Sequence, residues 1–87
     1  METKTAHITA RGFDLKVTTP ARYVVALVRE TPVEVEGYRG PRILEAGAEV
    51  KMRTDDLVKA RRFVTRFGIS RDMVFAVIID KTTGEEV

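Results

Sequence analysis

The sequence predicts an α+β fold, with a small antiparallel or mixed β-sheet and one amphipathic helix packed on one face. Three observations predict this class. Segments of alternating or β-branched residues fill most of the chain. One later segment alone has helical periodicity with capping residues at both ends. No linker or internal repeat divides the 87 residues, so we expect a single α+β domain over residues 1–87.

The first half of the chain is expected to be extended. In residues 5–19 every second residue from Phe13 to Val17 is apolar, which is typical of a half-buried strand. Arg11-Gly12 interrupts this segment, and either a tight hairpin turn or a bulge in one long strand would explain it. Residues 22–29 favour a strand through their three valines, although Thr19-Pro20 could instead begin a helix.

Further strands are predicted along the rest of the chain. Val33 and Val35 alternate with glutamates, and residues 43–53 are expected to form one strand with a bulge at Gly47. Residues 73–80 form a strongly apolar strand, and residues 85–87 begin a return strand after a turn.

Residues 54–68 are predicted to form the helix. Thr54 is the expected N-cap, and Asp55 and Asp56 lie at the positive end of the helix dipole. Gly68 suits a left-handed stop. At 100° per residue the apolar side chains gather within about a third of the circumference; they are Leu57, Ala60, Phe63, Val64 and Phe67.

Two of the predicted strands are apolar on both faces, which is typical of strands buried on both sides. One helix covers only one face. The second face, which we assign to Val24, Val28 and Ile78, is therefore expected to be covered by the N-terminal hairpin, by a second copy of the chain in a homodimer, or by another protein.

Composition argues against an enzyme and against cofactors. The chain has no cysteine, and His7 is its one histidine, so a transition-metal site has few ligands and we predict none. No phosphate-binding or dinucleotide-binding glycine pattern is present. We predict no catalytic residue, no metal site and no cofactor.

The chain carries no targeting or membrane signal that we can identify. Residues 1–5 lead into no apolar region, so no signal peptide is expected. No apolar run approaches the roughly 20 residues that span a bilayer. We therefore expect a soluble, cytoplasmic protein that does not bind membranes.

Charge is distributed unevenly although the net charge is only +2. Residues 51–71 hold seven basic and two acidic residues, a net +5, whereas residues 72–87 hold one basic and four acidic residues, a net −3. Lys59, Arg62 and Arg66 fall on the outer face of the predicted helix. This face could contact nucleic-acid phosphates, although solvated arginines are common on such faces.

The segment Gly37-Tyr38-Arg39-Gly40-Pro41-Arg42 is the clearest loop, because two glycines and a proline interrupt regular structure. Tyrosine and arginine are enriched at interface hot spots. Tyr38, Arg39 and Arg42 are therefore candidate partner-binding residues. Alternatively, the loop is an ordinary connection whose Tyr38 covers the edge of the core.

The C-terminal unit has a family resemblance. It combines Arg53-Thr54-Asp55-Asp56-Leu57-Val58-Lys59-Ala60-Arg61-Arg62-Phe63 with the closing Val77-Ile78-Ile79-Asp80-Lys81-Thr82-Thr83-Gly84-Glu85-Glu86-Val87. This unit of about 35 residues resembles the ending of small orphan accessory proteins of actinobacterial phages. The resemblance implies a small product that binds a host protein and alters host growth, and it brings no catalytic residues with it.

Together these features predict a non-enzymatic protein-interaction module of the phage accessory type that binds a host factor. The alternative is a nucleic-acid-binding module that uses the basic outer face of the helix.

Overall fold

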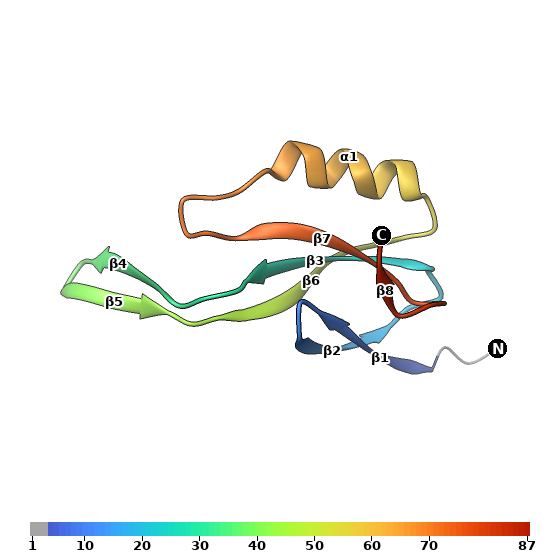
Figure 1. The fold of residues 1–87 in the computed structure, drawn as a ribbon, viewed down its shortest axis with the longest axis horizontal. Coiled ribbons are helices and arrows are strands. Elements are labelled where there is room, and N and C mark those ends of the chain that lie inside the picture. Colours follow the sequence, from blue (N-terminus) through green and yellow to red (C-terminus); the bar gives the residue numbers. More distant parts are fainter. Residues whose placement is uncertain (1–3) are drawn as a thin grey trace.

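The computed structural model describes residues 4–87 (Figure 1). In chain order the elements are β1 (Thr5–Ala10), β2 (Phe13–Thr18), β3 (Tyr23–Arg29), β4 (Val33–Gly37), β5 (Gly40–Leu44), β6 (Gly47–Thr54), α1 (Leu57–Phe67), β7 (Phe75–Asp80) and β8 (Glu85–Glu86). All strand pairs among them are antiparallel. The predicted α+β class is confirmed, with strands in the majority. The expectation about a signal peptide rests partly on residues 1–3, which lie outside the described residues.

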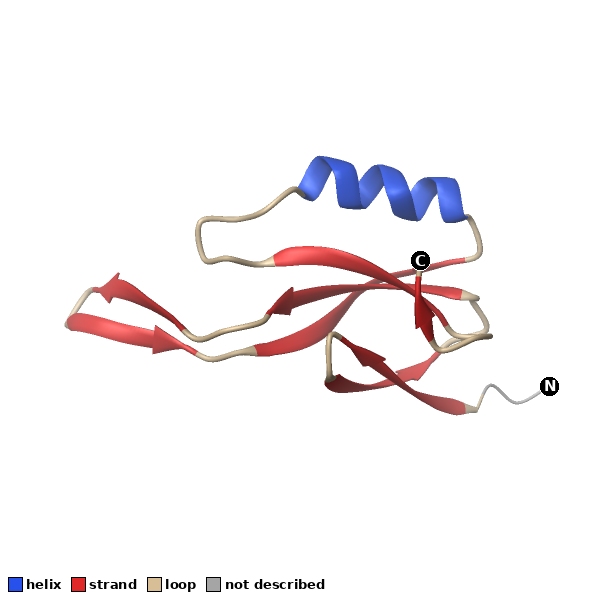
Figure 2. Ribbon diagram, in the orientation of Figure 1, coloured by secondary structure: helices blue, strands red, loops and turns tan. Residues whose placement is uncertain are grey.

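The main sheet has four strands in the order β6-β3-β7-β8. β3 lies inside this sheet, between β6 and β7, and its valines favour the extended backbone. The pairs β1-β2 and β4-β5 form two separate hairpins (Figure 2). The strand prediction for residues 22–29 is therefore confirmed over Tyr23–Arg29.

One face of the main sheet packs against α1. Val25 of β3 and Ala76 and Ile78 of β7 form a buried cluster with Ala60 of the helix. The partly buried side chains of the helical apolar stripe surround this cluster; they are Leu57, Phe63, Val64 and Phe67. The 3.6-residue period of the stripe is what lets one side of α1 reach the sheet.

The opposite face of the main sheet is covered by the N-terminal hairpin. Arg11 and Gly12 both have positive φ angles, 51° and 89°, as a two-residue type I′ turn requires. The pairing Ala10↔Phe13 then closes a hairpin rather than one bulged strand. The inward side chains of this hairpin join those of β3 and β7 in a second core; they are Ile8, Ala10, Leu15 and Val17.

Arg11 holds the tip of this hairpin against the end of the chain. Its Nε donates to Glu86 Oε1 at 2.9 Å, and its Nη1 lies 3.4 Å from Glu30 Oε1. The guanidinium also lies 5.3 Å from the centre of the Phe75 ring. The hairpin is therefore bound to the sheet both by its apolar side and by its turn.

Of the three covers expected for the second sheet face, the structure shows the N-terminal hairpin, and the grouping of Val24, Val28 and Ile78 on one face is wrong. Val24 and Val28 have no exposed surface, because the β1-β2 hairpin covers them. Ile78 is also buried, but it lies on the other face, beneath α1. The three residues therefore share no surface, and within residues 4–87 they leave no apolar sheet face open for a second copy or a partner.

Three local boundaries also differ from the sequence prediction. Residues 43–53 are not one strand, because β5 ends at Leu44 and β6 begins at Gly47. The irregularity in β6 lies at Lys51, which has no partner where β3 passes from Val25 to Ala26. The helix N-cap is Asp56, whose carboxylate accepts from the Lys59 amide at 3.1 Å. Gly68 ends the helix as predicted, with φ at 60°.

Asp80 is a buried carboxylate that ties the end of β7 to the start of β3. It is 4% exposed and accepts hydrogen bonds from Arg22 Nε and Nη2 and from the Thr82 amide. The hydrogen bond from Arg22 lowers the pKa of Asp80 below its ordinary value, against the opposing effect of burial. Lys81 continues the link, with its Nζ donating to the Thr19 carbonyl.

Replacing Val28 tests the two-sided core. Val28→Thr keeps the shape but places a hydroxyl in an apolar cluster, so we expect the free energy of unfolding to fall by about 1–3 kcal/mol in urea denaturation. The matched control Val33→Thr lies on a half-buried position of β4 and should change it by less than about 0.5 kcal/mol. Equal effects of the two variants would contradict the assignment of Val28 to the core.

The pH dependence of stability tests Asp80. Because the pKa of Asp80 is lower in the folded chain than in the unfolded chain, its ionised carboxylate stabilises the fold at pH values above the unfolded-state pKa. This stabilisation is lost as the pH falls through the folded-state pKa. Asp80→Asn should therefore lower the free energy of unfolding at pH 7 and flatten its decline below about pH 4. Urea unfolding between pH 2 and pH 7 measures this, with the exposed Asp14→Asn as control. Parallel curves for wild type and Asp80→Asn would refute the role of the ion pair.

Candidate interaction site

No group of three His, Cys, Asp or Glu residues that could hold a metal ion occurs among residues 4–87. His7, Asp55 and Asp56 therefore do not meet in such a group. Asp55 instead accepts a hydrogen bond from the Arg22 amide at 2.7 Å, and Asp56 caps α1. Two surfaces carry the residues singled out in the sequence, namely the β4-β5 hairpin and the exposed side of α1.

The β4-β5 hairpin projects from the domain as an arm, residues 33–44 (Figures 1 and 2). Its two strands pack mainly against each other. The molecule is elongated, with extents of 50 × 25 × 19 Å along its principal axes. The loop predicted over residues 37–42 is too long, because Gly37 ends β4 and Gly40 begins β5. These two glycines pair, which leaves Tyr38 and Arg39 as a two-residue turn. Gly40 has a φ of 114°, a backbone conformation that residues other than glycine rarely adopt.

Of the predicted partner-binding residues, Tyr38 and Arg39 form the tip of this arm and Arg42 lies at its middle pair. Tyr38 is fully exposed, so the alternative in which it covers the edge of the core is wrong. Arg39 is exposed beside it, and Arg42 is exposed opposite Val35, two pairs beyond the closing pair of the turn. Neither arginine forms an ion pair with another described residue. The structure thus brings an aromatic ring and two uncompensated cations together on a projecting element.

The arm has two chemically different faces, because paired residues of a hairpin share a face. Val33 with Leu44 and Val35 with Arg42 lie on one face, where the aliphatic side chains are half-buried. The other face carries Glu34 with Ile43 and Glu36 with Pro41, all of them exposed. Ile43 is 55% exposed, so apolar surface is present on both faces.

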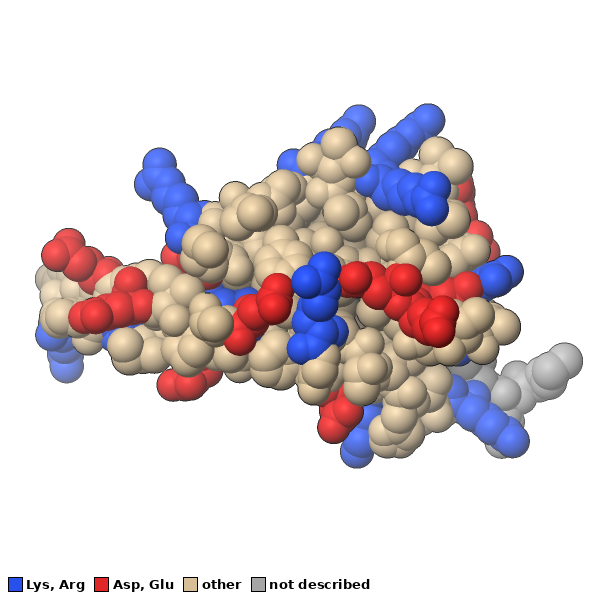
Figure 3. All heavy atoms as spheres, in the orientation of Figure 1, with Lys and Arg blue, Asp and Glu red and all other residues tan. Residues whose placement is uncertain are grey.

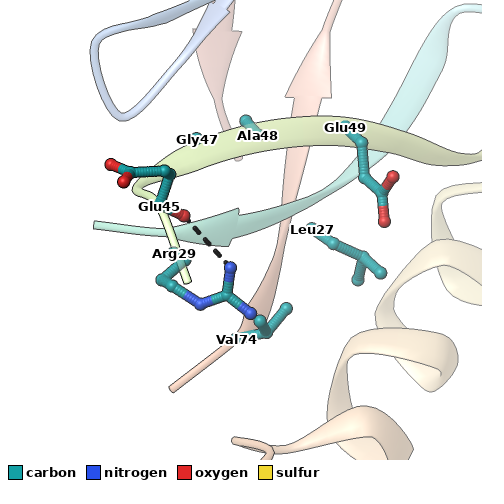
Figure 4. Close-up of a pocket in the computed structure, with 7 residues that line it drawn as sticks. All are labelled: Leu27, Arg29, Glu45, Gly47, Ala48, Glu49 and Val74. Atoms are coloured by element: carbon teal, nitrogen blue, oxygen red, sulfur yellow. Dashed lines mark hydrogen bonds between the residues drawn. The ribbon is translucent and has the colours of Figure 1, made fainter. Parts of the chain in front are cut away.

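Arg29 anchors the base of the arm (Figure 4). Its Nη1 donates to the Glu45 carbonyl at 3.1 Å, and its Nε donates to the Asp72 carbonyl at 2.9 Å. It thereby joins the end of the arm to the loop between α1 and β7. A cavity of about 260 Å³ lies beside it, with Leu27, Glu49 and Val74 among its lining residues. The sequence analysis missed Arg29. A cation at the end of an apolar strand does not indicate which backbone carbonyls it will bind in the folded chain.

Figure 3 shows Lys and Arg side chains projecting around α1. Three of the cations of this helix, Lys59, Arg62 and Arg66, are exposed and define what we call the basic surface of α1. None of the three forms an ion pair with a residue in the described range. They line a shallow groove of about 310 Å³ together with Met52 and Phe63. The three predicted residues are therefore brought together, with apolar side chains beside them.

Comparison with known proteins finds no matching family model, no matching curated protein and no matching solved structure. No helix within residues 4–87 has the length and apolar character needed to cross a membrane.

Proposed function

We propose that this chain is a non-enzymatic protein-interaction module that holds its partner through the β4-β5 arm. The observation that carries the proposal is the exposure of Tyr38 at the tip of an arm that packs mainly on itself. A fully exposed aromatic ring gains most from a partner that covers it, and arginines beside it add directional hydrogen bonds. Arg39 follows Tyr38 in the turn, and Arg42 is the next exposed arginine along β5.

A host protein is the partner that the phage accessory resemblance supports. The residues of that resemblance begin at the end of β6 and lie mainly in α1, β7 and β8, whereas the contact residues lie on the arm. In this proposal the C-terminal unit and the N-terminal hairpin form the folded base, and the arm makes the specific contact. The arm can then vary its contact residues without disturbing either core.

Affinity capture tests the arm. With nuclease added, the full chain should retain a specific protein from a lysate of its native host, and Tyr38→Ala should weaken this retention at least 10-fold, as expected for loss of a hot-spot side chain. The double variant Arg39→Ala/Arg42→Ala should also weaken retention. The control Val58→Ala removes an exposed apolar side chain from α1 instead. Retention that none of the arm variants reduces would refute the proposal.

Nucleic-acid binding through the basic surface of α1 is the second candidate function. It is favoured by the absence of ion pairs to Lys59, Arg62 and Arg66 within the described part of the chain. Phosphate oxygens would compensate these cations. Base stacking has less support, because Phe63 and Phe67 stack on each other at 5.8 Å and pack towards the sheet.

Salt dependence distinguishes this candidate. Three phosphate contacts predict that the affinity for a duplex oligonucleotide falls about 40-fold between 50 mM and 200 mM salt. Changing Lys59, Arg62 and Arg66 to Glu together should abolish binding in a fluorescence anisotropy titration, whereas Arg39→Glu/Arg42→Glu should preserve most of it. Oligonucleotide binding that survives the triple helix variant would exclude α1 as the nucleic-acid interface.

A further inference from the structure

We propose that the free edge of β4 accepts an added strand from the protein partner, and that this strand alternates basic and apolar side chains. The inference rests on the proposed function of the arm and adds the mode of recognition and the chemistry of the segment recognised. Strand addition of this kind takes its affinity from backbone hydrogen bonds and its specificity from alternate side chains.

Pro41 determines which edge of the arm is open. Glu36 pairs with Pro41, and proline has no N–H, so this pair cannot exchange both backbone hydrogen bonds. Since the two kinds of pair alternate along an antiparallel ladder, Gly37↔Gly40 and Val35↔Arg42 are the hydrogen-bonded pairs. The backbone groups of Glu34 and Glu36 therefore point away from β5.

The two edges of the arm are thus unequal. On β5 the outward backbone groups belong to Pro41 and Ile43, and Pro41 lacks the donor that an added strand needs. On β4 both Glu34 and Glu36 keep donor and acceptor. No hydrogen bond from elsewhere in residues 4–87 reaches the outward groups of these two glutamates.

The outer edge of the main sheet offers a contrast. β6 is an edge strand, and it carries the register irregularity at Lys51. Bulges and lysines are devices that protect edges from pairing with another chain. β4 has no bulge and no lysine, and its charged side chains are glutamates, which oppose an acidic strand and not a basic one. An isolated two-stranded hairpin is only marginally stable in water. A third strand on β4 would give the arm the support that the rest of the chain does not provide.

Side chains of β4 select the chemistry of the added strand. Glu34 and Glu36 lie on one face, and neither forms an ion pair with a described residue. Residues beside them on a neighbouring strand would therefore be favoured if basic, and disfavoured if acidic. Val33 and Val35 lie on the opposite face, where aliphatic neighbours are favoured. An extended segment alternating Lys or Arg with aliphatic residues satisfies both faces. The same glutamates disfavour a second copy of β4.

A synthetic peptide in which Val and Lys alternate over seven residues tests this inference with the full-length chain. We expect it to bind, measured by fluorescence anisotropy, and to slow amide hydrogen exchange of Glu34 and Glu36 at least 10-fold at saturation. A peptide of the same composition with three Val followed by four Lys, and one alternating Val and Glu, should bind at least 10-fold more weakly.

Variants of Glu36 separate the backbone contribution from the charge. Glu36→Pro removes an outward donor while leaving the hydrogen bonds to β5, so it should weaken the alternating peptide at least 10-fold. Glu36→Thr keeps the donor and should weaken it about 2- to 5-fold. Cross-strand nuclear Overhauser effects between Val35 and Arg42 verify that the arm remains folded.

Three results would overturn the inference. The first is an unchanged peptide affinity in Glu36→Pro. The second is that the amides protected from exchange by the peptide lie on β6 or α1. The third is that the amides of Glu34 and Glu36 become protected in the free chain as its concentration rises, which would make a second copy the occupant. If Tyr38→Ala reduces capture of the partner and Glu36→Pro does not, the proposed function stands and the added strand is wrong. If neither reduces capture, the proposed function fails, and the peptide result alone decides whether β4 accepts a strand.

Discussion

Burial of β3 on both faces is the constraint on which the rest of this structure depends. Val24 and Val28 require a cover on one side, and Val25 requires a cover on the other. The β1-β2 hairpin and α1 supply these covers from opposite ends of the chain. Each layer buries apolar surface only because β3 lies between them. The chain beyond Arg29 leaves this core and returns at β6, and the intervening residues form the arm.

Elements with a local signal were predictable from the sequence. The period of α1 and the stop at Gly68 are set by residues within one or two turns of each other. The hairpin at Arg11-Gly12 stayed open as an alternative, because a turn and a bulge use similar residues there. The prediction of a single strand over residues 43–53 was wrong, because Glu45 and Ala46 separate β5 from β6. Neither residue type is a strong signal for a break in a strand, so the sequence did not indicate this boundary.

The long-range arrangement could not be obtained in the same way. Apolar residues on both faces of residues 22–29 correctly required two covers, but nothing near Val28 indicates that Ile8 and Leu15 supply one of them. Ile78 was wrongly assigned to the sheet face of Val24 and Val28. Which side chains of β3 and β7 share a face depends on the pairing register, and this register places Ile78 opposite Val25.

The candidate site was predictable in composition and not in shape. Glycine and proline around Tyr38 predicted a loop over residues 37–42, but only Tyr38 and Arg39 lie outside the strands. The exposure of the Tyr38 ring was one of two alternatives that the sequence left open. That the flanking segments pair into an arm, with Arg29 fixing its base, depends on contacts with Glu45 and Asp72 that lie 16 and 43 residues away. The open edge of β4 follows from the pairing of Pro41, which only the register reveals.

Native-state amide hydrogen exchange tests the two-sided core most directly. If the β1-β2 hairpin is an integral layer, its hydrogen-bonded amides and those of Val24 to Val28 should exchange with the same free energy, equal to that of global unfolding. The amides of Glu34 and Glu36 should exchange orders of magnitude faster, since they point to solvent. Rapid exchange throughout β1 and β2, with β3 still protected, would contradict the account, because it would mean that this hairpin leaves the sheet while the rest stays folded.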